Sequence, residues 1–221
     1  HVPEGQHLLH KVHIQSDVKD IQVTELDDYL RQTPNSKVFG LLRMQLGIYN
    51  LAGKDTTRKV NRLLMRLGDP PVLYDESQTT ISAQQIQKLM VNKGYMNAKV
   101  TDTVKLKNKK AIVSYQIKSN QPYLLRNYNV NIDYPVLQRI ASDTARSLIR
   151  NGMLFDTDVL DQERERVASR FRERGFYNFN KEFLVYKADS SLNENKVDLT
   201  LDLREYLKTG KDSVNQIIFK Q

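Results

Sequence analysis

An internal repeat constrains the fold of this chain more than any other feature of its sequence. Residues 7–14 (HLLHKVHI) match residues 123–130 (YLLRNYNV) in pattern, and both alternate with a period of two from the first leucine onward. Farther along, residues 92–97 (NKGYMN) echo residues 173–178 (ERGFYN), each where a helical pattern stops and a strand pattern begins. Period-two alternation is typical of a half-buried β-strand. Two copies of this arrangement predict two units of similar fold.

Each copy predicts a helix before its glycine–aromatic pair. In the first copy, residues 82–85 (SAQQ) have the pattern of a capping box, so we expect a helix that begins there and ends at Gly94. In the second copy, a helix is predicted from about residue 157 to 174, closed by Gly175. Its expected buried side chains are Leu160, Val167 and Phe171.

A second helix is predicted directly after the first strand of each copy. Residues 24–27 (TELD) favour a short helix that ends at about Arg31. In the second copy Pro135 suits a first helical turn and Gly152 a helix end. The predicted buried stripe of that helix consists of Leu137, Ile140, Ala141 and Leu148.

A β-hairpin is predicted after each glycine, with outgoing strands at 98–106 and about 180–188. Each copy therefore reads strand, helix, helix, strand, strand, which is an α+β unit with a three-stranded mixed sheet covered by two helices. We expect a first domain at 1–120 with a partly helical insertion at about 33–80, and a second domain at 121–206. Residues 207–221 are expected to be a tail or the start of a following element.

The insertion is densely apolar from Val38 to Leu51, and a helical spacing of apolar residues follows at 60–67. One interpretation is that these elements thicken the core of the first domain. The other is that they offer an apolar surface to a partner or a membrane.

Composition excludes several kinds of site. The 221 residues include no cysteine, so a disulfide framework, a thiolate metal site and a cysteine nucleophile are excluded. No apolar run approaches the roughly 20 residues that a transmembrane helix needs. The net charge of +8 is uneven, with 18 basic and 11 acidic residues in 1–120 against 16 and 15 in 121–221. Because the chain begins with His1 and not methionine, we expect it to be a piece of a longer protein.

The titratable residues do not converge on a catalytic or metal-binding pattern. His7, His10 and His13 lie on a predicted strand, where residues three apart point to opposite faces. The acidic residues of 161–166 (DQERER) alternate with arginines and are interpreted as a solvated helix face. A glycine-rich phosphate loop and a nucleophile elbow are both lacking. We therefore expect no catalysis, no metal and no cofactor.

The tandem order of elements, with Gly94-Tyr95 and Gly175-Phe176 at the helix-to-strand corners, resembles POTRA domains of the BamA and TamA family of barrel-assembly and translocation proteins. Further local patterns are similar to the Bacteroidetes branch of that family: VPEG at 2–5 before Leu8-Leu9, RQTPN at 31–35, GDPPV at 68–72 and DQERER at 161–166. The resemblance implies a periplasmic scaffold ahead of a C-terminal outer-membrane β-barrel, without catalysis or cofactor. The corner residues Tyr95 and Phe176 are expected to pack in the core, and a contact between successive domains is the alternative.

The family's topology implies where such a domain would bind. The last strand lies in the centre of the sheet and the middle strand on an edge, so an extended segment of an unfolded outer-membrane protein or an accessory subunit can add to that edge. The alternative role for lysines on an edge strand is protection against aggregation. The candidate edge residues are Lys99, Thr101, Thr103 and Lys105 in the first domain, and Glu182, Leu184 and Tyr186 in the second.

Two other classes of partner are alternatives to an added strand. The basic first half and the hairpin at 105–110 (KLKNKK) would suit nucleic-acid phosphates, but the aromatic residues are not laid out as a stacking platform, so no nucleic acid is expected. A contact with a membrane surface is the other alternative, because lysines also attract anionic lipid headgroups. Phosphate binding would weaken steeply with salt, whereas strand addition would not.

Overall fold

The computed structural model describes residues 2–19, 21–35, 69–191 and 194–204, together with Leu51 and Leu63. The chain divides into two compact units, His1–Leu89 with Ala98–Ser119 and Met90–Asn97 with Asn120–Gln221. Most of the apolar insertion and the predicted tail lie outside the described residues, so both interpretations of the insertion stay predictions. Each unit has the predicted α+β fold, with one three-stranded sheet and its helices.

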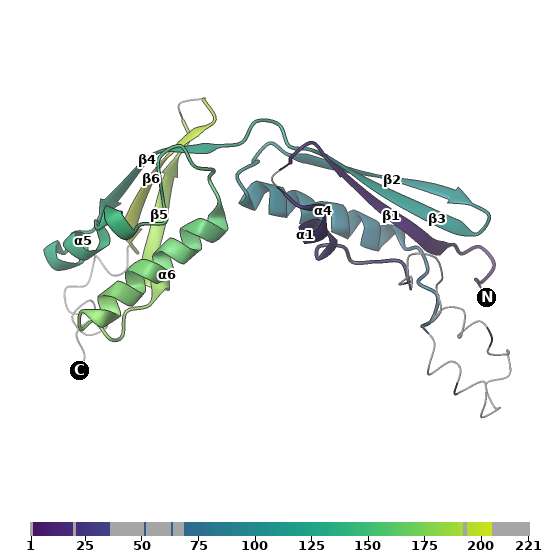
Figure 1. Cartoon of the computed structure of the whole chain (residues 1–221), viewed down its shortest axis with the longest axis horizontal. Helices are drawn as coiled ribbons and strands as arrows, with labels where there is room; N and C mark the ends of the chain where they lie inside the picture. The colour runs from purple at the N-terminus through teal and green to yellow at the C-terminus, as the bar shows by residue number, and fades with distance from the viewer. Residues whose placement is uncertain are drawn as a thin grey trace. The chain divides into compact units, whose positions relative to one another are not determined.

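The two sheets have the same topology (Figure 1). The first contains β1 (Leu8–Ser16), β2 (Lys99–Lys107) and β3 (Lys110–Lys118) in the order β1-β3-β2. The second contains β4 (Leu124–Asn131), β5 (Leu184–Asp189) and β6 (Lys196–Leu203) in the order β4-β6-β5. In each sheet the first strand runs parallel to the last and the middle strand antiparallel to it. The last strand is therefore central and the middle strand lies on an edge, as expected for both copies.

Helices cover one face of each sheet. In the first unit α1 (Val23–Asp27) and α4 (Glu76–Asn92) lie on the same side of the sheet in Figure 1. In the second unit α5 (Pro135–Ala141) and α6 (Thr157–Glu173) share one core with β5 and β6. A short 3-10 helix, Thr144–Arg146, follows α5. The opposite face of each sheet carries the alternate, mostly polar side chains of its strands.

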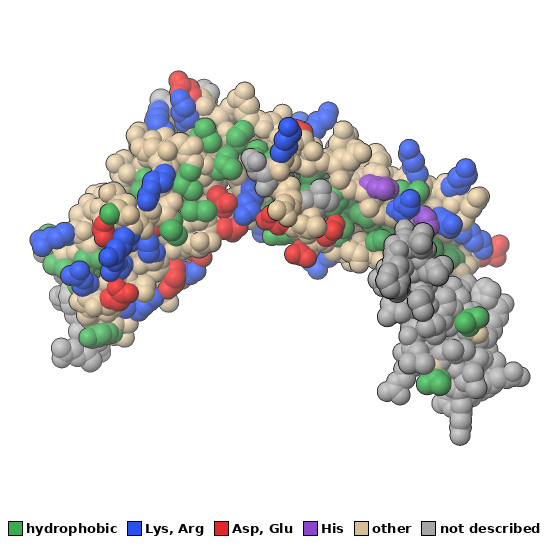
Figure 2. Space-filling view, viewed as in Figure 1, with side chains coloured by type: hydrophobic (Ala, Val, Ile, Leu, Met, Phe, Trp, Pro, Cys, Tyr) green, Lys and Arg blue, Asp and Glu red, His purple; other side chains and the backbone are tan. Residues whose placement is uncertain are grey.

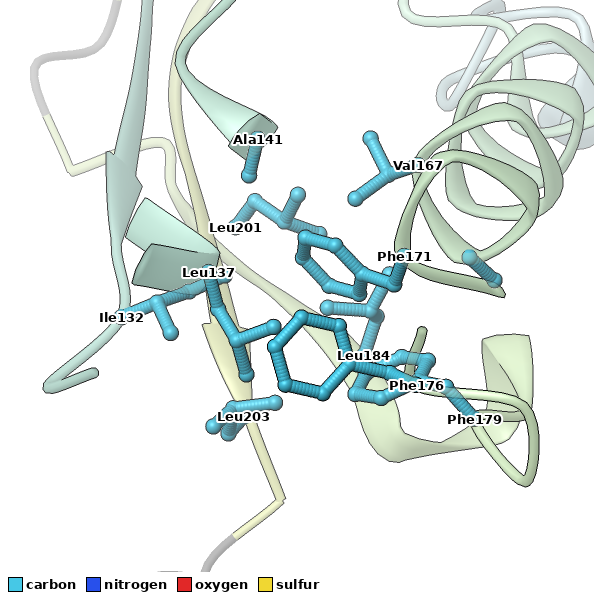
Figure 3. Close-up of a cluster of buried hydrophobic side chains, with 11 residues drawn as sticks. Ile132, Leu137, Ala141, Val167, Phe171, Phe176, Phe179, Leu184, Leu201 and Leu203 are labelled. Carbon is cyan, nitrogen blue, oxygen red and sulfur yellow. The ribbon is translucent and has the colours of Figure 1, made fainter. Parts of the chain in front are cut away.

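Aromatic and leucine side chains fill the core of the second unit (Figure 3). The Phe171 ring packs edge-to-face on Phe179 with 4.6 Å between ring centroids, and on Phe176 at 6.3 Å. Leu201 and Leu203 of β6 complete this core from the sheet. The predicted burial of Leu160, Val167 and Phe171 on α6 is confirmed.

The predicted start of the helix before Gly94 is wrong. Helix α4 begins at Glu76, where Asp75 Oδ1 accepts hydrogen bonds from the backbone N–H groups of Ser77 (2.8 Å) and Gln78 (3.4 Å). Ser82 lies inside the helix, and its hydroxyl donates to the Gln78 carbonyl at 2.7 Å and accepts from Arg31 N–H at 2.9 Å. A buried serine that bonds back to the preceding turn has the same local sequence as a cap.

Two further helix predictions need correction. The short helix of the first copy starts at Val23 and ends at Asp27, and Gln22 precedes it without a side-chain cap. The helix that starts at Pro135 ends at Ala141 and not at Gly152, because the chain turns at Ser142 and continues in the 3-10 helix. Leu148 is accordingly 44% exposed.

A shared hydrogen-bond pattern ends both long helices. Gly94 N–H bonds to Val91 O at 3.0 Å and Tyr95 N–H to Met90 O at 2.9 Å. The equivalent bonds at the end of α6 run from Gly175 to Arg172 (3.1 Å) and from Phe176 to Phe171 (3.1 Å). This is the Schellman motif, which requires a left-handed residue at the glycine position and pairs an apolar residue after it with the last helical turn. The φ angles are +92° at Gly94 and +101° at Gly175, and both following aromatic residues are buried.

Candidate strand-addition edges

The turn between β2 and β3 determines which backbone groups β2 offers to solvent. Asn108 and Lys109 form a two-residue turn with φ values of +50° and +57°, and Lys107 lies opposite Lys110. Such a turn closes on a hydrogen-bonded pair, and hydrogen-bonded and non-hydrogen-bonded residues alternate from there along an antiparallel strand. The backbone groups that point away from β3 therefore belong to Val100, Asp102, Val104 and Leu106.

The hydrogen bond of the Val100 N–H agrees with this alternation. The Val100 N–H points to the side-chain Oε1 of Gln87 on α4, at 3.5 Å, instead of to β3. Within the described residues, the outward groups of Asp102, Val104 and Leu106 have no such partner. This stretch of β2 is therefore an open edge, able to donate to and accept from another extended segment.

The residues predicted from the sequence lie beside these positions. Lys99, Thr101, Thr103 and Lys105 are all on β2, but the alternation directs their backbone groups to β3 and their side chains to the uncovered face. Sequence reasoning missed the residues that carry the open backbone groups. The signal that could have found them is the length of the turn. A two-residue turn makes Lys107 a hydrogen-bonded residue, and every second residue before it, beginning with Leu106, then points its backbone groups outward.

The first strand of each sheet is covered at its beginning. Leu9 N–H donates to Val72 O at 2.8 Å, and Tyr74 N–H donates to His7 O at 2.8 Å. In the second unit the same role falls to the segment before α6, where Leu125 N–H donates to Met153 O at 2.8 Å. These contacts close the start of β1 and of β4. The edges that contain the predicted sites are those of the middle strands β2 and β5.

The edge of β5 is shorter and partly covered. Arg204 N–H donates to Phe183 O at 2.9 Å, so the alternation turns the backbone groups of Leu184 outward. The guanidinium of Arg164 already donates to the Leu184 carbonyl at 3.2 Å. β5 has six residues against nine in β2, so β2 offers the longer open edge.

The structure places the three residues predicted for the second edge differently. Leu184 and Tyr186 lie on β5 with their backbone groups turned outward, whereas Glu182 precedes the strand. Glu182 lies in a 3-10 helix, Lys181–Phe183, and not in the strand, because the Asn180 side chain accepts from Glu182 N–H at 2.9 Å and starts that turn. The Leu184 side chain is buried in the core. Tyr186 packs on the same core, and its hydroxyl donates to Leu160 O at 3.0 Å.

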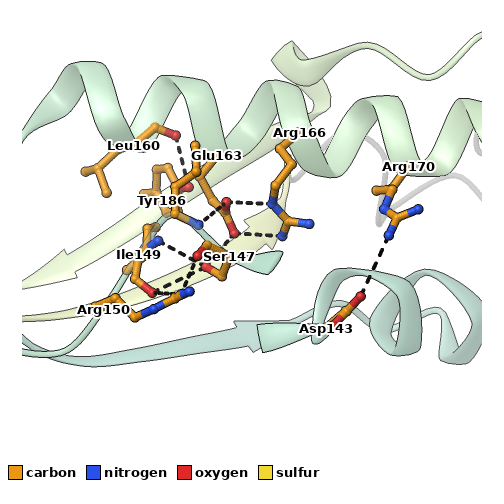
Figure 4. Close-up of polar contacts among 10 residues, drawn as sticks. Asp143, Ser147, Ile149, Arg150, Leu160, Glu163, Arg166, Arg170 and Tyr186 are labelled. Atoms are coloured by element: carbon orange, nitrogen blue, oxygen red, sulfur yellow. Dashed lines mark hydrogen bonds and ion pairs between the residues drawn. The ribbon is translucent and has the colours of Figure 1, made fainter. Parts of the chain in front are cut away.

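A buried glutamate, Glu163, pairs with Arg166 on α6 (Figure 4). Glu163 is fully buried and accepts two hydrogen bonds from Arg166, Nε to Oε2 at 2.7 Å and Nη2 to Oε1 at 2.8 Å. The Ser147 hydroxyl (2.7 Å) and Leu148 N–H (3.0 Å) donate to the same carboxylate. The interpretation of residues 161–166 as a solvated face is thus wrong at Glu163. Burial works to raise the pKa of Glu163, but these hydrogen bonds outweigh it and lower the pKa from its ordinary value.

The described residues also contain a polar pocket. A pocket of about 280 Å³ is lined by three arginines, one aspartate and Ile140, and its Asp143 faces Arg170 at 3.9 Å. In the described part of the chain, no group of three or more His, Asp or Glu is arranged to hold a metal ion. No helix in this part of the chain has the length and hydropathy to cross a membrane.

No family model and no curated protein matches this sequence. Among solved structures, POTRA domains 3–5 of Haemophilus influenzae BamA are similar with a TM-score of 0.45 and 15% identity, over 92% of this chain and 68% of that chain. BamA from Haemophilus ducreyi lacking POTRA domains 1–3 has a TM-score of 0.42 and 16% identity, over 90% of this chain and 29% of that one. POTRA domains 1–2 of Omp85 from Anabaena have a TM-score of 0.37 and 12% identity, over 91% and 98%. Each of these similarities extends over at least 90% of this chain.

Proposed function

We propose that this chain is a pair of POTRA domains from the periplasmic part of an outer-membrane β-barrel assembly or translocation protein. In this proposal it binds unfolded client proteins or accessory subunits by strand addition, without catalysis or a cofactor, and the native protein carries a C-terminal barrel. The supporting observation is the open edge of β2, at Asp102, Val104 and Leu106, in a sheet whose last strand is central. The same topology recurs in the second unit.

Strand addition suits clients that differ in sequence. Main-chain hydrogen bonds supply the affinity, and these are the same for every client except at proline. The strands of a barrel alternate in polarity over about ten residues. A nine-residue edge such as β2 is long enough to pair with most of one such strand.

We also propose that the chain belongs to the Bacteroidetes branch, which its segments 31–35 and 68–72 resemble. In the structure the first of these segments contacts residues 70–75, which include part of the second. The Asn35 side chain donates to Pro70 O at 2.8 Å and accepts from Val72 N–H at 3.0 Å. Gln32 likewise donates to Leu73 O at 3.0 Å and accepts from Asp75 N–H at 3.1 Å. The two motifs therefore hold together the two ends of the insertion.

The proposed function is tested by closing the edge without changing its ladder to β3. In Val104→Pro the lost N–H is one that points outward, so β2 keeps its hydrogen bonds to β3. The control Val104→Thr keeps the N–H and a β-branched side chain. The probe is a ten-residue peptide that alternates polar and apolar residues. A version N-methylated at every residue, which has no free N–H on either edge, is the second control.

We expect the unmodified peptide to bind the unsubstituted chain and Val104→Thr alike, and to lose at least about tenfold in affinity on Val104→Pro. The N-methylated peptide should bind none of the three. Equal binding to all three proteins, or binding of the N-methylated peptide, would overturn strand addition at β2. Circular dichroism of each variant checks that its fold is unchanged.

A further inference from the structure

The uncovered face of the first sheet carries a one-sided charge. On β3 this face consists of every second residue from Lys110 to Lys118. The residues of β1 and β2 that pair with those positions lie on the same face. Six lysines lie there and no acidic residue of the three strands does, since Asp102 lies opposite the buried Tyr115. Figure 2 shows basic side chains projecting along this part of the molecule. The lysines are Lys11, Lys99, Lys105, Lys107, Lys110 and Lys118.

The matching face of the second sheet is electrically balanced. Arg126 donates to Asp198 through Nε at 2.8 Å, and Lys187 lies 2.8 Å from Asp202. Lys196 is 3.0 Å from Glu194. None of the six lysines of the first sheet has such a pair among the described residues. The same fold in the same chain thus has one neutral face and one cationic face.

The other side of the β2 edge carries three apolar side chains and the exposed Asp102. Val100, Val104 and Leu106 direct their side chains to the helix side of the sheet. Leu106 is 52% exposed and Val104 is half-buried, so both have free apolar surface. A strand added to β2 would place its side chains alternately beside these residues and beside the lysines of the uncovered face.

We infer that β2 selects an extended segment that alternates acidic and apolar residues. Carboxylates of the segment lie on the uncovered face beside Lys99, Lys105 and Lys107, and its apolar side chains lie beside Val100, Val104 and Leu106. This selectivity rests on the proposed strand addition and names its preferred partner. Opposite charges on directly neighbouring strands stabilise pairing, and like charges destabilise it.

The composition of the face favours a protein segment over a nucleic acid. Proteins that bind single-stranded nucleic acid stack the bases on aromatic side chains. The strand positions of this face include no Phe, Tyr or Trp. The three lysines of β2 lie at the edge itself, where an added strand meets them directly.

The test compares two ten-residue peptides that differ in charge alone, one alternating glutamate with valine and one alternating lysine with valine. Binding to the 221-residue chain is measured at low and high salt. The double substitution Lys99→Glu/Lys105→Glu reverses the charge of the edge. Its matched control, Lys19→Glu/Lys88→Glu, makes the same change in net charge at exposed positions outside the sheet.

We expect the acidic peptide to bind about tenfold more tightly than the basic one, with the ratio shrinking as salt rises. The edge variant should invert this preference and the control should keep it. Equal affinity for both peptides would overturn the selectivity and leave strand addition standing, whereas binding of neither would overturn both. A preference of the chain for single-stranded RNA or anionic vesicles over the acidic peptide would overturn the inference in favour of a phosphate-bearing partner.

Discussion

Arg166 forms a two-point ion pair with Glu163, whose carboxylate is fully buried. Arg166→Met is expected to leave that charge without its main partner, and breaking a buried pair costs about 3–5 kcal/mol. In the double variant Glu163→Gln/Arg166→Met both charges are gone, and the glutamine keeps an oxygen that can accept from Ser147 or Leu148, so most of the loss should be recovered. Urea unfolding of the three proteins measures this. A double variant as unstable as Arg166→Met would show that packing, and not the unpaired charge, is responsible.

The same carboxylate predicts a pH dependence. Because the pKa of Glu163 is lowered in the folded state, its contribution to stability is complete above its ordinary pKa of 4.5. That contribution is lost as the pH falls through the lowered folded-state pKa. Melting temperatures between pH 7 and pH 3 should therefore fall more steeply for the unsubstituted chain than for Glu163→Gln, which has no proton to take up. Parallel curves would contradict this assignment.

Asn35 is expected to hold the base of the insertion closed. Asn35→Ala removes a buried side chain that makes two hydrogen bonds to the backbone, so we expect a loss of about 1–3 kcal/mol. The exposed neighbour Thr33 gives the control Thr33→Ala. Hydrogen exchange at the Val72 amide reports the contact directly and should accelerate in Asn35→Ala alone. Unchanged exchange at Val72 would contradict the role of Asn35 in holding the segments 31–35 and 68–72 together.

The two corner glycines should differ in their tolerance of a side chain. A Cβ on Gly94 would lie 3.0 Å from the carbonyl oxygen of Phe155, which belongs to the same unit, whereas a Cβ on Gly175 would meet nothing within 4 Å. Both positions have a left-handed backbone, which costs about 1–2 kcal/mol for alanine. Gly94→Ala should therefore destabilise the chain more than Gly175→Ala in chemical unfolding. Equal losses would mean that the Phe155 backbone moves aside freely.

The repeated pattern of strands and helices could be predicted because each element depends on local periodicity. Leu160, Val167 and Phe171 follow helical spacing and are buried as expected. Glu163 could not be predicted in this way, because its partners Ser147 and Leu148 come from a distant segment. From the sequence, a carboxylate between arginines is predicted to be solvent-exposed, because the donors that allow its burial are brought to it only by the tertiary fold.

The candidate site was predicted at the level of the strand and not of the residue. The family's topology placed an open edge at residues 98–106, and β2 lies there. Which residues turn their backbone outward depends on the turn at Asn108 and Lys109, whose length sets the alternation for the whole strand. The prediction that Glu182 lies on the strand is wrong for a related reason. The Asn180 side chain accepts from Glu182 N–H and starts a 3-10 turn, so β5 begins only after it.

Amide hydrogen exchange along β2 tests strand addition most directly. Exchange is followed by NMR for the 221-residue chain alone and with the alternating ten-residue peptide. We predict that the peptide slows exchange at Asp102, Val104 and Leu106, while Thr101 and Thr103, already bonded to β3, stay protected and unchanged. Slower exchange that is confined to another part of the chain, or no change at these three amides under saturating peptide, would contradict the account.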